Sequence, residues 1–577
     1  MDSATPPTGA YTEIPVERTA QLIRVRRDLI LNQPIGSFKG PNTLGRFALS
    51  YSRAQSFRSI DPSYATRRSF FVEDDDEIFD PNTLAPATRG ARLSTLIHDF
   101  RRPYGAVESD EEDSDSVFDD TRSFASFRNT YSTAAQGRLH PARSHISLVE
   151  STPLVLKHVE DAEGKVHTVI AGQSTKPQTV FNSVNVLIGV GLLALPLGMR
   201  YTGWAMGGFI LTVCCAVTFW SAGLLGYCMD TDQTLMTYAD LGYASFGSRG
   251  RLLISFLFSL DLLGSCVALI ILFSDSLNAL FPQFSVTQWK LIGFVVLTPF
   301  SFLPLNVLSI FSLLGITCTI SVVVLTFFCG LFKPETPGSL VEFAPLNMWP
   351  DTGLDFLLGV AILMAPFGGH AIFPNLKADM RHPHKFQSSL KITYGITYVT
   401  DFSMAVIGYL MFGTKVGNEV TNSLLLTGGY PAYIYYLISG LVSMVPFAKL
   451  PLNVNPIVNV LEVVLGCDKT AVREQQASQK VSGLGLPLWC NVLLLNALVV
   501  TVNLLVVLIA IVMPDFDRVI GLMGASLCFL ICLILPTCFY LRLCGDKIGG
   551  AERVCCYVCI GVSVVLGVTC TYATLRN

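Results

Sequence analysis

Charged side chains are scarce over most of this chain. Lys, Arg, Asp and Glu make up 14% of its 577 residues, against about a quarter in ordinary soluble proteins, and 51% of the residues are hydrophobic. Residues 1–175 hold 20 of the 40 basic and 24 of the 43 acidic side chains. The composition therefore excludes a soluble globular enzyme and predicts a polar tail followed by an integral membrane protein.

Cysteine is absent from the first 200 residues, and the 16 cysteines beyond them lie mostly in apolar segments. Cys556 and Cys559 form a C-x-x-C pair without a second pair, so we expect no zinc site, no other metal and no cofactor. The chain also lacks an N-x-S/T glycosylation motif, and its first residues lack the basic and apolar stretches of a signal peptide. The tail is therefore expected to stay in the cytosol.

The tail, residues 1–175, is predicted to be disordered. Two acidic runs, 73–77 and 108–120, are separated by stretches rich in Ser and Arg. Such sequence buries too little apolar surface to offset its chain entropy. Serines beside the acids, such as Ser114, are candidate phosphorylation sites, so kinases or sorting factors are candidate partners. A solvated spacer is the alternative.

The rest, residues 176–577, forms a predicted transmembrane domain. A helix needs about 20 residues to cross a hydrocarbon core of about 30 Å. Eleven apolar segments meet this length, with Pro299 and Pro304 interrupting the fourth: 178–199, 203–228, 250–281, 288–306, 308–332, 354–376, 387–413, 431–456, 484–513, 517–540 and 553–573. With the tail inside, 13 basic residues fall in inner loops and six on the opposite side, which predicts a cytosolic N-terminus and a C-terminus on the other side of the membrane.

The segment NVLIGVGLLALP, residues 185–196, has two possible meanings. Gly189, Gly191 and Ala194 fit the loose pattern of a dinucleotide-binding turn. That turn needs a preceding strand and an acid about 20 residues on, whereas here the flanks are long apolar runs and the next acid is Asp230. The glycines and Pro196 instead predict a break in the first membrane helix, with a small-residue packing face as the alternative.

The sixth apolar segment carries a matching signal, MAPFGGHAIFP, at residues 364–374. Gly191–Pro196 and Gly369–Pro374 both read G-x-x-x-x-P with another glycine just upstream. Two broken helices, each opening a set of five spans, predict an inverted-repeat secondary transporter. Freed N–H groups suit a carboxylate and freed carbonyls suit an ammonium or a cation, so a zwitterionic amino acid matches both.

Five segments agree in order with one known pattern. They are TVFNSVNVLIGVGLLALPLGMRYTGW (179–204), LMTYADLGYASFG (235–247), LDLLGSCVALIILFSDSLNALFP (260–282), FPNLKADMRHPHKF (373–386) and GYLMFG (408–413). Over about residues 176–575 the chain resembles the amino acid/auxin permease family of the amino acid–polyamine–organocation superfamily. Within it the chain is most similar to fungal vacuolar amino acid transporters, relatives of the vesicular inhibitory amino acid transporter.

The resemblance implies an all-α body of about eleven helices, the first ten in a leucine-transporter-like 5+5 inverted repeat with helices 1 and 6 broken. It further implies that the substrate's main-chain groups meet both breaks. The residues matched in this way are Gly189, Val190, Gly191, Leu192, Phe367, Gly368 and Gly369. Asn185, one turn before the first break, is expected to hold freed backbone with its amide, with a local helix-packing hydrogen bond as the alternative.

Four ionisable residues within the spans are candidates for proton coupling: Asp261, His370, Lys449 and Asp401. Such residues are costly in a membrane and are functional by default, although each has a fixed salt bridge or a water-filled cavity as its alternative. Asp261 is the first choice, since span 3 of this fold passes beside both breaks. Sodium-coupled relatives use hydroxyl residues of span 8, where this chain has Ser443 but also Lys449, which disfavours sodium.

The resemblance further implies the function, which is secondary active transport of amino acids, neutral and as a further option basic, across the vacuolar membrane by proton antiport with alternating access. The expected partners are the substrate, protons and the lipid bilayer of the vacuolar membrane, with no nucleic acid and no enzymatic activity. Two alternatives stay open. One is an amino-acid-sensing receptor on the same fold that signals through its tail, and the other is a sodium-coupled symporter.

Overall fold

The computed structural model describes residues 50–51, 78–79, 86–87, 156–160, 166–170, 174–231, 235–380, 382–464, 488–545 and 548–576. The chain divides into two units, Met1–Pro34 with Val72–Ile170, and Ile35–Phe71 with Ala171–Asn577. The first contains two antiparallel pairs of strands, β1 (Ile78–Phe79) with β2 (Pro86–Ala87) and β3 (Leu156–Glu160) with β4 (Val166–Ile170). These strands lie in the tail that the sequence predicts to be disordered. Most of that tail lies outside the described residues.

The second unit contains the membrane body. Its helices, in chain order, are α6 (Lys176–Leu187), η2 (Val190–Ala194), α7 (Leu195–Thr202), α8 (Trp204–Thr231), α9 (Tyr238–Leu280), α10 (Val286–Leu297), η3 (Thr298–Phe302), α11 (Leu305–Phe332), α12 (Gly353–Met364), η4 (Ala365–Phe367), α13 (Phe373–Ala378), η5 (Pro383–Lys385), α14 (Phe386–Phe412), η6 (Gly413–Lys415), α15 (Val420–Leu426), α16 (Ala432–Val464), α18 (Leu488–Val512), α19 (Phe516–Leu522), η7 (Met523–Ile534), α20 (Leu535–Leu543) and α21 (Gly550–Arg576).

These helices account for the eleven predicted spans. Among the described residues, eight helices are long and apolar enough to cross a membrane, or nine when α6 and η2–α7 are taken as one span bent by 49°. Two shorter apolar helices, Val286–Phe302 and Gly353–Phe367, supply spans four and six. The prediction of an all-α membrane protein with its first and sixth spans broken is confirmed.

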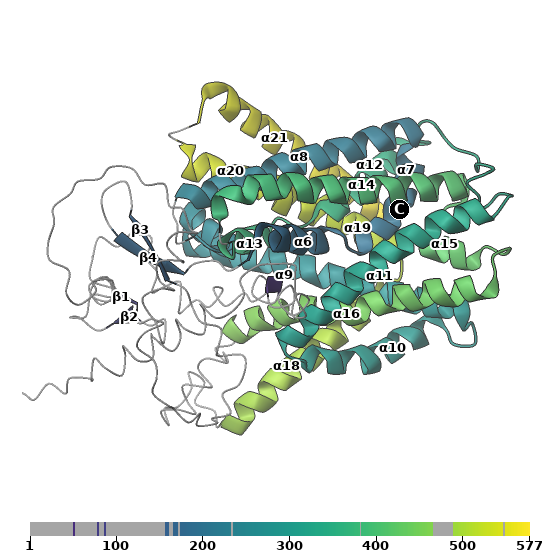
Figure 1. Cartoon of the computed structure of the whole chain (residues 1–577), viewed down its shortest axis with the longest axis horizontal. Helices are drawn as coiled ribbons and strands as arrows, with labels where there is room; N and C mark the ends of the chain where they lie inside the picture. Colours follow the sequence, from purple (N-terminus) through teal and green to yellow (C-terminus); the bar gives the residue numbers. More distant parts are fainter. Residues whose placement is uncertain are drawn as a thin grey trace, which may run out of the picture. The chain divides into compact units, whose positions relative to one another are not determined.

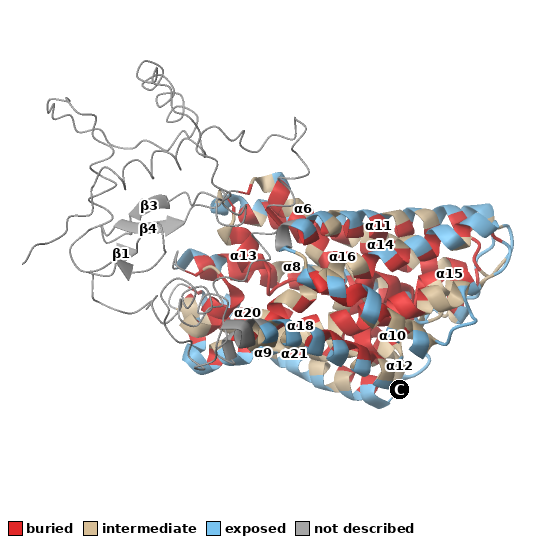
Figure 2. Ribbon diagram, turned by 90° about the horizontal axis from the view of Figure 1, so that it is seen from below, coloured by how far each residue is buried: buried red, intermediate tan, exposed pale blue. Residues whose placement is uncertain are grey.

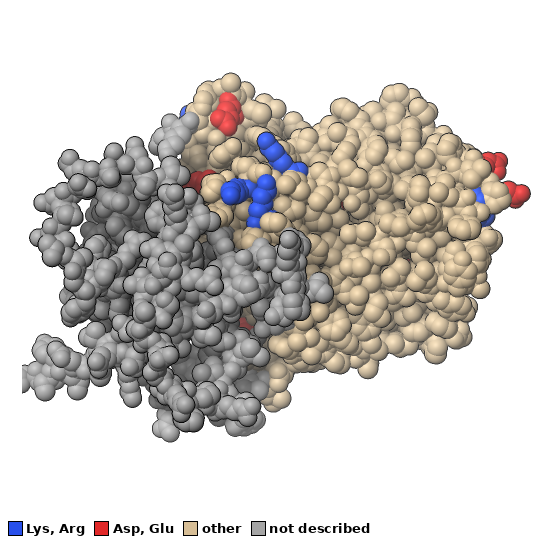
Figure 3. Space-filling model, viewed as in Figure 1, with Lys and Arg blue, Asp and Glu red and all other residues tan. Residues whose placement is uncertain are grey.

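The surface of the body suits a lipid environment. Large apolar side chains are exposed along α21, including Val554, Val558, Val565 and Val568. Figure 2 shows the exposed residues on the outward sides of the helices and the buried ones between them. On the face drawn in Figure 3, Lys, Arg, Asp and Glu lie toward the two ends of the body and leave its middle uncharged. Such a belt is costly in water and stable in hydrocarbon.

The two ends of the body are named here by their elements. Most long helices run roughly along the horizontal axis of Figure 1, so that α13 lies near one end and α15 near the other. The tail face is the end at which α6 begins and α13 lies. The opposite face is the end at which α15 lies and α21 finishes. Consecutive spans cross the body in alternating directions between these faces.

One long helix shows how a glycine shapes a span. α9 has 43 residues, more than a membrane crossing requires, and Gly247 within it has φ +73°. This left-handed conformation separates a short helix from the membrane helix that follows, and glycine adopts it without strain. Thr237 and Asp240 form a capping box at the start of the short helix, which fixes where it begins.

Candidate functional site

The first break lies at the buried centre of the body. α6 ends at Leu187, η2 begins at Val190, and Ile188 between them has an extended conformation (φ −73°, ψ 91°). The last carbonyls of a helix have no partners within it, and in a membrane they need others. The break therefore exposes hydrogen-bond acceptors in the middle of an apolar bundle.

Lys449 of α16 supplies the missing donors. Its Nζ donates to the carbonyl oxygens of Ile188, at 2.5 Å, and Asn185, at 3.2 Å. Both carbonyls belong to the last turn of α6, where the negative end of the helix dipole favours a cation. The structure thus places Lys449 directly on the first break, as the sequence could only suggest.

Asn185 has a different partner from the one expected. Its Nδ2 donates to Ser312 Oγ of α11 at 2.5 Å, while its buried Oδ1 has no hydrogen-bond partner among the described residues. The amide therefore ties α6 to α11, and Lys449 rather than Asn185 holds the freed backbone. Sequence reasoning missed Ser312, because a lone serine in an apolar span carries no local signal.

The glycines of the first break are not required by backbone conformation. Gly189 has φ −123° and ψ −159°, which any residue can adopt, and Gly191 lies within η2. A Cβ at Gly189 would meet only the Leu187 carbonyl oxygen, at 3.9 Å, whereas at Gly191 it would lie 3.4 Å from Pro366 N and Cγ. Neither glycine has the positive φ that would favour glycine over other residues. The reason for glycine at Gly191 is close approach between the two breaks.

The second break faces the first. After η4 the chain is non-helical from Gly368 to Ile372, where α13 is capped. A Cβ at Gly369 would lie 2.7 Å from Leu187 Cδ2. The structure therefore brings together the predicted substrate residues of both breaks, namely Gly189, Val190, Gly191, Leu192, Phe367, Gly368 and Gly369.

Two thiols donate hydrogen bonds to carbonyl oxygens at the second break. Cys532 Sγ donates to the Phe367 carbonyl oxygen at 3.6 Å, and Cys528 Sγ donates to the Ala365 carbonyl oxygen at 3.8 Å. Both come from η7, a π-helical segment of the tenth span. The sequence predicts no site role for these two cysteines, which lie in an apolar segment. The available signal was their spacing of four residues, which places both on one helix face.

His370 lies in the second break but faces α8. It is fully buried, and its Nε2 lies 2.9 Å from Ser221 Oγ and 3.0 Å from the Thr218 carbonyl oxygen. Its Nδ1 is buried and has no hydrogen-bond partner within the described part of the chain. The imidazole thus joins α8 to the break through one nitrogen.

The two candidate aspartates do not touch the first break through any hydrogen bond. Asp261 on α9 is half-buried, is within electrostatic reach of the Cys532 thiol, and forms no hydrogen bond to the residues that the structure describes. Asp401 on α14 is fully buried, and both of its carboxylate oxygens lack partners in the same residues. Asp261 is therefore closer to the second break's thiols, and Asp401 is separate from the site.

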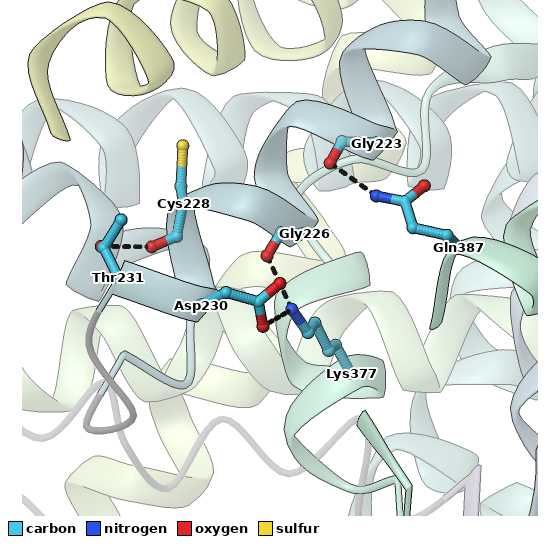
Figure 4. A network of polar contacts seen from close by, with 7 residues as sticks. All are labelled: Gly223, Gly226, Cys228, Asp230, Thr231, Lys377 and Gln387. Atoms are coloured by element: carbon cyan, nitrogen blue, oxygen red, sulfur yellow. Dashed lines mark hydrogen bonds and ion pairs between the residues drawn. The ribbon is translucent and has the colours of Figure 1, made fainter. Parts of the chain in front are cut away.

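A further polar contact anchors the tail-face end of the sixth span. Lys377 of α13 donates to the Gly226 carbonyl oxygen at 2.6 Å and forms an ion pair with Asp230, both at the end of α8 (Figure 4). The Lys377 side chain is 4% exposed and that of Asp230 is 63% exposed. Nearby, Gln387 of α14 donates to the Gly223 carbonyl oxygen at 3.0 Å. α13 is therefore fastened to α8.

Among the residues that the structure describes, no group of three or more His, Cys, Asp or Glu side chains is placed to hold a metal ion. The polar groups of the site are backbone carbonyls, one lysine, one imidazole, two thiols, and the Asn185 amide with the Ser312 hydroxyl. This arrangement can bind a polar solute and exchange a proton.

Comparison with known proteins identifies a matching family model and several similar proteins. The family model described as "transmembrane amino acid transporter protein" matches residues 172–576. Amino acid transporter AVT1B of Arabidopsis thaliana is 30% identical over 423 residues, covering 71% of this chain and 72% of that protein. Amino acid transporter AVT1I of the same plant is 26% identical over 437 residues, covering 73% and 99%. A solved structure titled "Inward facing conformation of Mhp1" matches with a TM-score of 0.43 at 13% identity, covering 70% of this chain and 90% of that one.

Proposed function

Because the chain belongs to the family of transmembrane amino acid transporter proteins, we propose that it is a vacuolar secondary transporter that exchanges amino acids for protons by alternating access. The substrates are neutral amino acids, with basic ones as a further option. The tail face is the cytosolic face in this proposal, and the chain ends in the lumen. The family supports amino acid transport, and the arguments below support the coupling.

The substrate's α-carboxylate is assigned to the N–H groups at the start of η2, and its α-ammonium to carbonyls of the two breaks. A helix N-terminus offers N–H groups without internal partners and a partial positive charge. The space beside Gly189 supports this placement, because a Cβ there meets only one atom within 4 Å. A bound amino acid can therefore approach the backbone at this position.

The proposal of proton antiport rests on one observation, which is that Lys449 Nζ donates to the carbonyl oxygens of Asn185 and Ile188. A protonated Lys449 and a substrate ammonium would compete for the same acceptors, and their like charges repel strongly at short range. Occupation by one then disfavours the other, as antiport requires. A lysine on these carbonyls also takes the place in which a metal cation would bind, which argues against sodium symport.

The test uses purified protein in proteoliposomes, with a pH gradient or a sodium gradient imposed separately. We expect amino acid accumulation that follows the pH gradient, collapses with a protonophore and is unchanged when sodium is replaced. Accumulation that needs sodium would refute the antiport. Absence of flux with any of the amino acids, in protein that binds them, would favour the receptor alternative.

Asp261→Asn decides between Lys449 and Asp261, the first choice from the sequence among the four coupling candidates. If Lys449 carries the proton, this variant accumulates substrate close to the wild-type level. If it loses gradient-driven accumulation but retains substrate exchange without a gradient, the coupling role moves to Asp261. The exchange assay separates a loss of coupling from a loss of binding.

A further inference from the structure

Two residues of the tail lie inside the membrane body. Ser50 and Tyr51 are helical, with 0% and 5% of their surfaces exposed, and they belong to the same compact unit as the spans. They precede α6 by more than a hundred residues in the sequence. A serine and a tyrosine from a polar tail are buried in this way only when other elements enclose them.

Ser50 makes the polar part of this contact. Its Oγ lies 2.5 Å from Ser174 Oγ and accepts a hydrogen bond from Asn182 Nδ2 of α6 at 2.8 Å. Ser174 in turn donates through its N–H to the Asp379 carbonyl oxygen at 2.7 Å and through its hydroxyl to the Asp379 carboxylate. Asp379 caps α13, so this chain of contacts links the tail-face ends of both broken spans.

Tyr51 makes the apolar part. It packs in a cluster with Leu308 of α11 and Leu452 of α16, with Val186 of α6 and Leu303 at the margin. These residues come from three separate membrane helices. The Tyr51 side chain therefore fills the space where α6, α11 and α16 meet.

This space lies next to the first break on its tail-face side. Leu452 follows Lys449 on α16, and Leu308 precedes Ser312 on α11 by one helical turn. Lys449 and Ser312 are the partners of Asn185 at the break. Tyr51 thus lies about one turn closer to the tail face than the polar contacts of the candidate substrate site.

We propose that Ser50 and Tyr51 form a plug that docks between α6, α11 and α16, closes the tail-face path to the first break and must withdraw for transport. Docking joins α6 to α11 and α16 through Tyr51 and to α13 through Ser50. Opening of the tail face requires these elements to separate. The occupant of the groove is the chain's own tail, and the proposed transport function enters only through the activity readout.

Docking itself is tested by thiol accessibility in the full chain. Leu308→Cys places a thiol beneath Tyr51, and a water-soluble maleimide applied from the tail face reports its exposure, relative to the same protein without Leu308→Cys. We expect slow labelling with wild-type Tyr51 and several-fold faster labelling with Tyr51→Ala. Tyr104→Ala, elsewhere in the tail, is the matched control and should leave labelling slow. Equal labelling of Leu308→Cys alone, with Tyr51→Ala and with Tyr104→Ala would overturn the proposal.

The effect on transport is tested with two truncations. Removal of residues 1–45 retains Ser50 and Tyr51, whereas removal of residues 1–60 deletes them. We expect uptake per reconstituted molecule to rise several-fold only in the longer truncation and in Tyr51→Ala. Equal uptake in both truncations would overturn the plug. If no variant transports any amino acid while the maleimide still distinguishes Tyr51→Ala, the proposed function fails and the docking stands.

Discussion

The two breaks share a sequence pattern but differ in their partners. The first break ends in carbonyls that receive the charged amine of Lys449, and the second ends in carbonyls that receive the weak thiol donors Cys528 and Cys532. An ammonium hydrogen bond is considerably stronger than a thiol one and depends on protonation. In the proposed antiport, the first break is therefore the one held by a titratable donor, and the second is held by neutral donors.

The breaks also differ in how their tail-face halves are held. α13, after the second break, is fastened to α8 by the ion pair of Lys377 and Asp230. α6, before the first break, is held by Lys449, by Ser312 and by tail residues Ser50 and Tyr51. Because Lys449 hydrogen-bonds to carbonyls of α6 and Tyr51 packs against Val186 of α6, we expect changes at either residue to act on this half-helix.

The largest effect is expected for Gly191→Val, which acts where the two breaks touch. A Cβ alone would lie 3.4 Å from Pro366, so the two γ-carbons of valine must displace the sixth span. Overpacking of this kind costs about 1–3 kcal/mol, and here it also closes the space for substrate. We expect both exchange and accumulation to be abolished in proteoliposomes, with protein still inserted in the membrane.

Gly191→Ala and Gly189→Ala are the matched controls. The first adds a methyl group at a tight but allowed distance, and the second adds one into open space. We expect Gly191→Ala to keep part of the exchange activity. Gly189→Ala should unfold at the wild-type temperature and yet bind substrate more weakly. Normal exchange in Gly191→Val would show that the meeting of the breaks is not the site.

Lys449→Met against Cys532→Ala tests the contrast between the breaks directly. Methionine fills a similar volume but cannot donate to the Asn185 and Ile188 carbonyls or titrate. We expect pH-driven accumulation to fall about tenfold or more in Lys449→Met. A tenfold fall corresponds to a loss of about 1.4 kcal/mol of coupling free energy. Cys532→Ala should keep the pH dependence. If accumulation by Lys449→Met still follows the pH gradient, a residue other than Lys449 couples transport to protons.

A smaller effect is expected when both thiols are removed. Cys528→Ala with Cys532→Ala leaves the Ala365 and Phe367 carbonyls without these donors, and thiol hydrogen bonds are weak. We expect exchange to fall by a few-fold through a higher KM, without a change in its pH profile. Cys570→Ala on α21 is the control, because that thiol is also buried but is not one of the donors to the Ala365 and Phe367 carbonyls. A changed pH profile in the double variant would show that the second break titrates as well.

The smallest effect concerns stability outside the breaks. Glu419, before α15, is 1% exposed, and burial, followed by the nearby Asp275, raises the pKa of its carboxyl well above the usual range. A raised pKa in the folded state means that its stabilisation is complete below the unfolded pKa of about 4.3 and is lost as pH rises through the folded value. Glu419→Gln does not titrate.

We therefore expect the wild-type Tm to fall between about pH 5 and pH 8 by about 2 °C more than that of Glu419→Gln. Thermal unfolding in detergent at both pH values measures this difference. Glu342→Gln changes an exposed loop residue and is the control, so its Tm should fall with pH as that of the wild type does. Identical curves for wild type and Glu419→Gln would contradict a titration of Glu419.

Much of the architecture follows from sequence because membrane insertion is governed by local rules. Length and hydropathy located every span, and repeated G-x-x-x-x-P located both breaks. The Asn185 amide illustrates the limit. Its position one turn before the break suggested that it holds backbone, but the side chain points to Ser312 because α11 happens to lie there.

The sequence by itself determined the membrane class, the spans and the broken first and sixth helices, since each depends on composition and on residues close together in the chain. Only the tertiary structure decided which groups meet the freed carbonyls: Lys449 at the first break, and Cys528 and Cys532 at the second. It also decided that Ser50 and Tyr51 lie beneath the first break. These pairings join residues more than a hundred positions apart, and they depend on how whole helices pack, which no local pattern encodes.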